Sequence, residues 1–128
     1  MPNFAIEFHD SKLLEMVCCS PGVLLALDAY VHSSTGTPGV DSGIGLIWRA
    51  ELRLSDARTN GSVSENARIM DGTVHTPQRA YENMIGAPLK VSGPVRIELS
   101  GHGWSLDIEG TELEIDLVGE GRFVEDVP

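Results

Sequence analysis

Long apolar runs are missing from this chain of 128 residues. The longest covers residues 23–27, whereas a helix that crosses a bilayer needs about 20 apolar residues. The first ten residues also lack the basic segment and apolar core that mark a secretory signal. We therefore predict no membrane span and no secretion, and we expect a cytoplasmic protein.

Cationic residues are scarce. Nine Lys and Arg stand against 19 Asp and Glu, which gives a formal net charge of −10. Because affinity for phosphate backbones comes from Lys and Arg, this balance argues against DNA or RNA as a partner. A basic protein stays open as a partner. The hydrophobic content of 41% is that of an ordinary globular protein, and we find no linker or repeat, so residues 1–128 are expected to form one domain.

The residues that usually build cofactor sites are also few. The two cysteines, Cys18 and Cys19, are adjacent and would point to opposite faces of a strand, so we expect reduced thiols. The four histidines show neither a His-x-His nor a His-Glu-x-x-His spacing. The glycines within residues 36–45 are not followed by Gly-Lys-Ser/Thr. We predict no metal and no cofactor.

What the chain does have is strict alternation of apolar and charged residues near its end. Ile97 and Leu99 share one face while Arg96 and Glu98 take the other, and the pattern continues to residue 118. Such alternation is typical of half-buried strands. We expect hairpin turns at Gly101-His102 and at Glu109-Gly110, where the weaker Glu-Gly signal also allows a bulge. This register would place Asp107 opposite both Arg96 and Glu112.

The rest of the chain adds further strands and one helix. Strands are expected over residues 12–19, 23–32, 44–55, 68–70, 73–75, 89–91 and 95–99. Asp71-Gly72 predicts a hairpin, and Ser92-Gly93-Pro94 predicts a break. Thr76 and Pro77 can begin a helix that Gly86 ends. The predicted fold is mainly β: a curled antiparallel sheet, barrel or sandwich, of about seven or eight strands with one short helix near residues 77–85.

Two groups of polar residues are candidates for a ligand site. His9 and Asp10 come just before the first predicted strand, next to Ser11. Consecutive residues cannot form a catalytic triad, and Asp10 or Ser11 would equally suit a turn. Asp28, Tyr30 and His32 share one face of a strand. They would line a cavity if that face points into a barrel, but surface placement avoids the cost of burying polar groups.

Acidic residues crowd the end of the chain. The outward-facing positions of the predicted meander include four carboxylates that we select as candidates for binding a protein, namely Asp107, Glu112, Glu114 and Asp116. A solvated charged face is the simpler interpretation, since charges on outer positions also discourage aggregation. The alternative is a docking surface for a basic protein, whose association a complementary field would accelerate.

The segment Phe8-His9-Asp10-Ser11-Lys12-Leu13, followed by a β-rich body with Gly119-Glu120 near its end, resembles small uncharacterised bacterial proteins. These include immunity-protein-like families of polymorphic toxin systems, which often begin with a His-Asp-x-x-Leu strand. The resemblance covers one short motif and the general layout. It implies a compact β fold in a bacterial cytoplasmic protein with a binding role, and it supplies no catalytic residues.

The sequence contains no motif that determines a reaction. Our leading hypothesis is a non-enzymatic binding module that engages a protein through its acidic face. The rival is a ligand-binding or enzymatic β-barrel that uses Asp28, Tyr30 and His32 with His9 near its mouth. A third hypothesis is a structural subunit whose sheet edges drive homo-oligomerisation.

Overall fold

The computed structural model describes residues 2–63 and 66–128, which form β-strands and no helix. The strands are β1 Asn3–Cys19, β2 Gly22–Ser34, β3 Gly43–Ser55, β4 Arg58–Ser62, β5 Ala67–Arg68, β6 Asp71–His75, β7 Ala80–Glu82, β8 Met84–Gly86, β9 Leu89–Gly101 and β10 Trp104–Val127. The mainly β prediction is confirmed.

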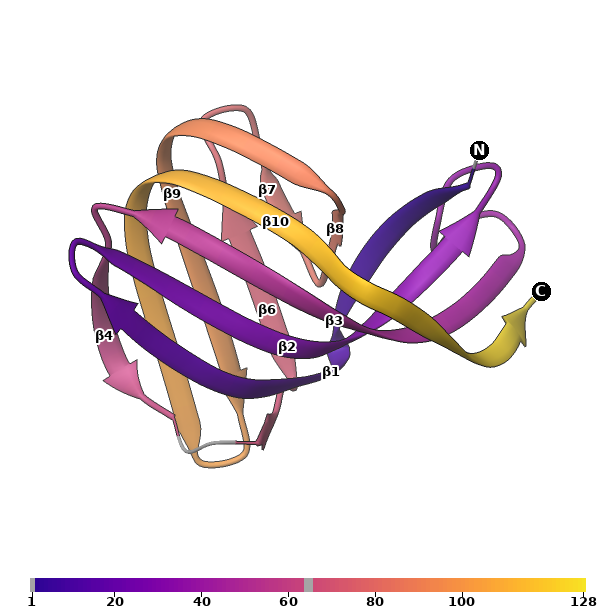
Figure 1. The fold of residues 1–128 in the computed structure, drawn as a ribbon, viewed down its shortest axis with the longest axis horizontal. Helices are drawn as coiled ribbons and strands as arrows, with labels where there is room; N and C mark the ends of the chain where they lie inside the picture. Colours follow the sequence, from indigo (N-terminus) through magenta and orange to yellow (C-terminus); the bar gives the residue numbers. More distant parts are fainter. Residues whose placement is uncertain (1, 64–65) are drawn as a thin grey trace.

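The strands form one antiparallel sheet that curls into a half-barrel (Figure 1). Its order is β5-β1-β2-β3-β10-β9-β6-β7, while β4 pairs with β10 and β8 pairs with β1. The long strands extend beyond this body. The start of β1, the end of β2, the start of β3 and the end of β10 form a projection on the right of Figure 1, which we call the arm.

The segment that was predicted to be a helix is instead a pair of short strands. β7 pairs with β6, and β8 pairs with β1, so residues 80–86 connect the two ends of the curled sheet. Between them Asn83 has a φ of 63°, outside the range of a right-handed helix. Its N–H donates to the Gly72 carbonyl, and its carbonyl accepts from the Phe8 N–H. Backbone groups at these two sheet ends need partners, and this requirement overrode the local helix signal.

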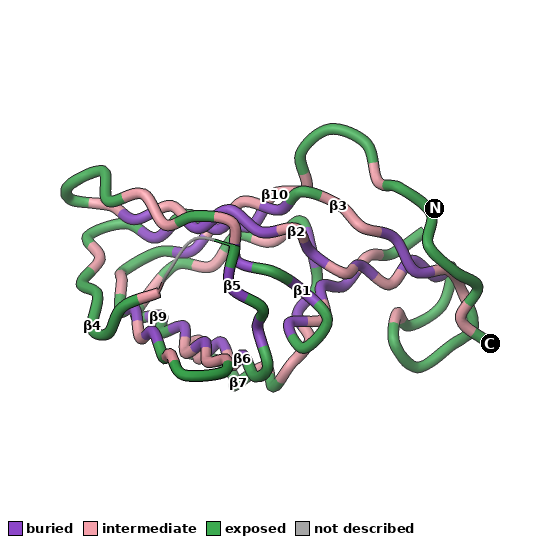
Figure 2. The backbone as a smooth tube through the Cα atoms, turned by 90° about the horizontal axis from the view of Figure 1, so that it is seen from below, coloured by how far each residue is buried: buried purple, intermediate pink, exposed green. Residues whose placement is uncertain are grey.

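The core lies on the inner side of the curled sheet. Buried positions (purple in Figure 2) run through the long strands of the body and continue into the arm. The meander faces are confirmed: Trp104 and Leu117 are partly buried against the core, and the other inward residues are at most 3% exposed. These residues are Val95, Ile97, Leu99, Leu106, Ile108, Leu113 and Ile115.

The register of the meander differs from the prediction, although its faces do not. Gly101 pairs with Trp104, so the turn residues are His102 and Gly103, and Gly103 has the positive φ of 78°. A shift by two residues leaves every side chain on its own face. The second predicted hairpin is wrong: β10 continues through Glu109-Gly110 with a bulge before Glu112, which pairs with Ser92 rather than Asp107.

Two other glycine signals were also misleading. Gly72 does not form a hairpin turn but lies within β6 opposite Leu99, while β5 pairs with β1. Ser92-Gly93-Pro94 does not end a strand, because β9 continues through it with Gly93 at a φ of 104°. Glycines accommodate turns, bulges and close side-chain approach alike, so local sequence does not distinguish these roles.

Candidate functional site

The Phe8-His9-Asp10-Ser11 segment forms a large bulge in β1. Glu7 pairs with Tyr30 and Lys12 with Asp28, so four residues of β1 bulge out against one of β2. Phe8 turns inward and is completely buried. The Ser11 hydroxyl donates to the Glu7 carbonyl at 2.6 Å and accepts from the Tyr30 N–H at 2.9 Å. Ser11 therefore replaces the backbone pairing that the bulge interrupts.

His9 and Asp10 lie on the exposed part of this bulge. The ring nitrogen Nδ1 of His9 is 2.8 Å from the Met70 carbonyl oxygen. The backbone N–H of His9 donates to Asn83 Oδ1 at 2.8 Å. His9 and Ser11 thus contact different backbone groups. The bulge does not have the nucleophile–base arrangement of a catalytic triad.

Tyr30 and His32 share the outer face of β2. Their rings are 5.1 Å apart in an edge-to-face arrangement with an interplanar angle of 72°. The Tyr30 hydroxyl donates to Glu125 Oε1 at 3.2 Å. Its ring crosses the intervening strand β3 at Gly45, where a Cβ would clash with the phenol. Gly45 therefore permits a contact between two strands that are not neighbours.

His32 also contacts β1, through the side chain of Glu7. Its Nε2 is 3.1 Å from Glu7 Oε1, and the two side chains are only 12% and 18% exposed. Nδ1 of His32 is buried and has no hydrogen-bond partner among the residues that the structure describes. Burial and the neighbouring Asp10 carboxyl raise the pKa of Glu7, against the opposing effect of His32.

The same surroundings act on Tyr30. Burial is the largest cause that raises its pKa to about 12, followed by the charges of Glu125, Glu7 and Asp10. We call Glu7, Asp10 and Glu125, together with Tyr30 and His32, the acidic cluster. The acidic cluster suits a cationic group. Such a group can form ion pairs with the carboxylates and stack on the aromatic rings.

The acidic cluster joins some predicted residues and separates others. It contains Asp10, Tyr30 and His32, whereas Asp28 lies between Lys12 of β1 and Arg49 of β3 in the sheet register. Glu7 was not predicted, although it alternates with buried Ile6 and Phe8 on β1. Glu125 stood out only as one of the acidic residues near the end of the chain, because its contact with Tyr30 depends on the pairing of distant strands.

The predicted acidic stripe is largely compensated by cations of the same sheet. Asp116 is 2.9 Å from Arg53, and Glu114 is 3.8 Å from Arg53 and 3.9 Å from Lys90. Glu112, the third of these predicted carboxylates, has no ion pair within residues 2–63 and 66–128. The negative potential of the acidic stripe is therefore weaker than its number of carboxylates suggests.

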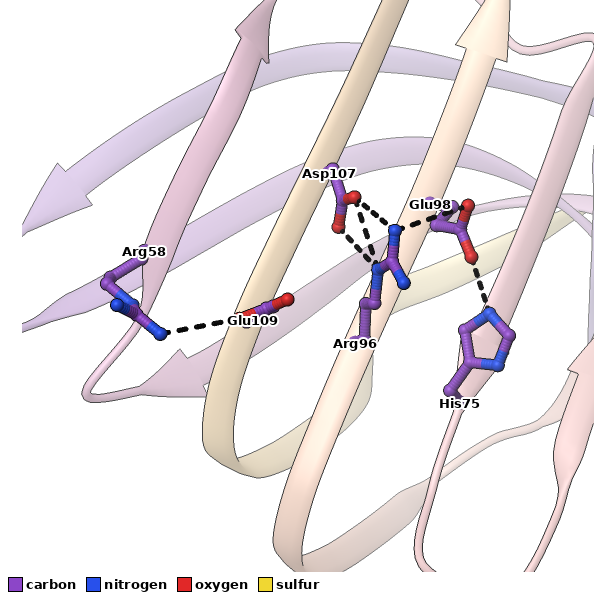
Figure 3. A network of polar contacts seen from close by, with 6 residues as sticks. All are labelled: Arg58, His75, Arg96, Glu98, Asp107 and Glu109. Atoms are coloured by element: carbon purple, nitrogen blue, oxygen red, sulfur yellow. Dashed lines mark hydrogen bonds and ion pairs between the residues drawn. The ribbon is translucent and has the colours of Figure 1, made fainter.

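Asp107, the fourth predicted residue, belongs to a polar network over β4, β10, β9 and β6 (Figure 3). Arg96 donates to both carboxylate oxygens of Asp107, at 2.9 and 2.6 Å, and these hydrogen bonds lower the pKa of Asp107. His75 Nε2 lies 2.5 Å from Glu98, and Arg58 lies 3.5 Å from Glu109. A cleft of about 470 Å³ opens beside this network.

Within the described residues, no group of three or more His, Cys, Asp and Glu side chains has an arrangement that could hold a metal ion. The same part of the chain contains no helix of the length and hydropathy that a membrane span requires. Models of known protein families, curated protein sequences and solved structures were compared with this chain, and none of them matches it.

Proposed function

We propose that this protein is a non-enzymatic binding module that engages a basic segment of a protein partner through the acidic cluster. The observation that carries the proposal is the gathering of Glu7, Asp10 and Glu125 around Tyr30, with the His32 ring 3.1 Å from Glu7. The raised pKa values of Glu7 and Tyr30 result first from burial and then from the neighbouring carboxylates. A Lys or Arg from a partner would supply the missing positive charge.

The chemistry favours an arginine in particular. Glu125 uses one carboxylate oxygen for Tyr30, which leaves the other for a guanidinium. The edge-to-face rings of Tyr30 and His32 offer an aromatic surface on which a planar guanidinium can stack. The net charge of −10 would add long-range attraction for a basic partner and make association sensitive to salt.

The likeness of the Phe8–Leu13 segment to immunity-protein-like families stays a prediction. A binding role agrees with it, but the segment has a structural explanation of its own. Phe8 fills the core and Ser11 bridges two strands. The proposal therefore depends on the acidic cluster and not on the motif.

Binding of defined peptides tests this function. A set of peptides of equal length, rich in Arg, Lys or Glu, is titrated against the protein at low and high salt. We expect the Arg-rich peptide to bind best, and its affinity to fall as salt rises. The double variant Asp10→Asn/Glu125→Gln should weaken binding by about tenfold or more, since two charged contacts are lost.

The matched control is Glu112→Gln, which removes an acidic charge from the predicted stripe rather than from the cluster. It should bind the Arg-rich peptide as the wild type does. Equal losses in the control and in the double variant would assign the effect to net charge alone. Binding that ignores salt, or a preference for the Glu-rich peptide, would contradict the proposal.

A second candidate function is small-ligand binding in the cleft beside the polar network. Its volume of about 470 Å³ lies in the range of ligand pockets, roughly 300–1,000 Å³. Arg58, His75 and Arg96 line it together with Glu109, so donors and an acceptor face the same space. A thermal-shift screen of small anions and zwitterions tests it, with Arg58→Ala as the variant that should abolish any stabilisation. A stabilising ligand unaffected by this change would place the ligand elsewhere.

A further inference from the structure

The last part of β10 is an edge of the sheet. β10 pairs with β9 only as far as Ile115, whereas on its other side it pairs with β3 as far as Val127. Within residues 2–63 and 66–128, no strand pairs with the β9-facing edge after Ile115. Figure 1 shows this yellow segment along the margin of the arm. An edge of this kind presents backbone donors and acceptors to a further strand.

This edge carries unusual apolar exposure. Phe123 is 56% exposed, Val124 is 44% exposed and Val118 is 39% exposed, and they are three of the five large hydrophobic side chains found exposed in the described chain. Proteins usually protect sheet edges with charges, prolines or a covering segment. An unpaired edge with exposed apolar side chains has the features of an edge that accepts a further strand.

A bulge arranges the charges of this edge. Arg122 pairs with Ile47 and Glu125 pairs with Gly45, two residues away on β3, while Phe123 pairs with Leu46. Because Val124 is the extra residue, Arg122 and Glu125 lie on one face of the sheet and Phe123 lies on the other. Without the bulge, residues three apart on a strand would face opposite ways.

We propose that a second copy of this chain pairs with this edge, antiparallel and centred on Phe123, to form a two-fold symmetric dimer. In that register the extra residue Val124 of each copy stays out of the ladder, as it does against β3. Arg122 of each copy then lies opposite Glu125 of the other, so the same ion pair forms twice. On the opposite face the two Phe123 rings meet across the symmetry axis. The four long strands of each arm then form one continuous sheet across the dimer.

Self-complementarity is what selects a second copy as the occupant. Arg122 and Glu125 lie on one face, one on each side of the apolar centre at Phe123. A two-fold rotation about this centre therefore brings Arg122 of one copy to Glu125 of the other. Arg122 has no ion pair within the described residues, so its charge is available for a partner. Glu125 keeps one oxygen on Tyr30 and has a second oxygen for the Arg122 guanidinium. A partner arginine would use this same oxygen, so the dimer and the Arg-rich peptide should compete for it. Opposite charges directly across two strands stabilise pairing, and like charges oppose it.

Sedimentation over a series of protein concentrations tests the dimer. The wild type should sediment as a monomer–dimer equilibrium. Arg122→Glu places Glu opposite Glu at both symmetric positions and should raise the dissociation constant by about tenfold or more. Glu125→Arg places Arg opposite Arg and should act in the same way. Circular dichroism checks that each variant keeps its β structure.

Two further measurements separate this dimer from any other association. The double variant Arg122→Glu/Glu125→Arg restores opposite charges and should recover the wild-type constant. An equimolar mixture of the two single variants should form a heterodimer. The control Glu112→Arg changes a position of β10 that is paired on both sides and should leave the equilibrium unchanged.

A wild type that stays monomeric throughout the series would overturn the inference, as would a double variant that does not recover. The result is also distinguishable from the proposed function. Arg122 lies outside the acidic cluster, so Arg122→Glu should dissociate the dimer while each chain still binds the Arg-rich peptide.

Discussion

The ring of Phe8 lies directly against the backbone of Gly72. A Cβ added at Gly72 would come within 2.6 Å of the Phe8 ring carbon Cγ, so only glycine fits this position of β6. The β1 bulge directs Phe8 inward at the point where β8 and Asn83 connect β1 to β6. The Phe8 ring thereby fills the space that a side chain at position 72 would occupy, and it packs β1 against β6.

Gly72→Ala should destabilise the protein by about 1–3 kcal/mol, because the new methyl group forces either Phe8 or the β6 backbone to move. Urea unfolding monitored by tryptophan fluorescence measures the change. Gly86→Ala is the control, since its nearest neighbour would be 3.8 Å away, and it should change stability by less than about 0.5 kcal/mol. Equal losses at both sites would contradict the packing argument.

Ser11→Ala should cost about 1–3 kcal/mol, because it leaves the N–H of Tyr30 without its acceptor at a site where Ser11 is 1% exposed. The amide of Tyr30 should also exchange with solvent faster, which NMR hydrogen exchange detects. Ser105→Ala, at an exposed position of β10, provides the comparison and should be nearly neutral. A Tyr30 amide that stays protected in Ser11→Ala would show that the hydroxyl is dispensable.

Glu7→Gln should change how stability depends on pH. Folding raises the pKa of Glu7 above its usual 4.5, so the protonated carboxyl is favoured in the folded state. Its contribution is complete below pH 4.5 and is lost as pH rises through the folded-state pKa. The variant should therefore gain stability relative to the wild type between acidic and neutral pH.

Unfolding midpoints of Glu7→Gln and wild type across this pH range measure the difference. Glu15→Gln, the same change of charge at a half-exposed position of β1, serves as the control. A difference that shrinks towards neutral pH would reverse the predicted sign. It would mean that the His32 contact outweighs burial.

Arg96→Met should lower the urea midpoint at neutral pH, because Asp107 loses its three hydrogen bonds to the guanidinium. These bonds lower the pKa of Asp107, so the stabilisation is present above the usual value of 3.8 and is lost as pH falls through the folded-state pKa. The difference between variant and wild type should therefore shrink in acid and at high salt. Arg58→Met, at a contact of 3.5 Å with an 86% exposed arginine, should have a smaller effect.

The alternating pattern correctly indicated which faces are buried. Ile97, Leu99, Ile108 and Leu113 point inward because only one side of each strand can leave water, and this requirement is local to each strand. The hairpins were less predictable. Glu109-Gly110 and Asp71-Gly72 have turn residues, but the energy of a turn is small compared with the pairing of a long strand on both of its edges.

The candidate site was predictable only in part. Tyr30 and His32 could be grouped because residues two apart on a strand share a face. Their acidic neighbours come from β1 and β10, and Tyr30 reaches Glu125 only because Gly45 has no side chain. The contact of Asp107 with Arg96 was expected from the alternating meander, whereas the contact of Asp116 with Arg53 depends on the pairing of β10 with β3.

The sequence by itself determined the mainly β class, the inward faces of the long strands and the excess of negative charge, because side-chain alternation and composition act within each segment. Only the tertiary structure decided which carboxylates are neutralised, where residues 80–86 pair and which edge of β10 stays open. Those outcomes depend on contacts between strands that are far apart in the chain, where hydrogen-bond pairing and charge neutralisation are settled by the whole sheet.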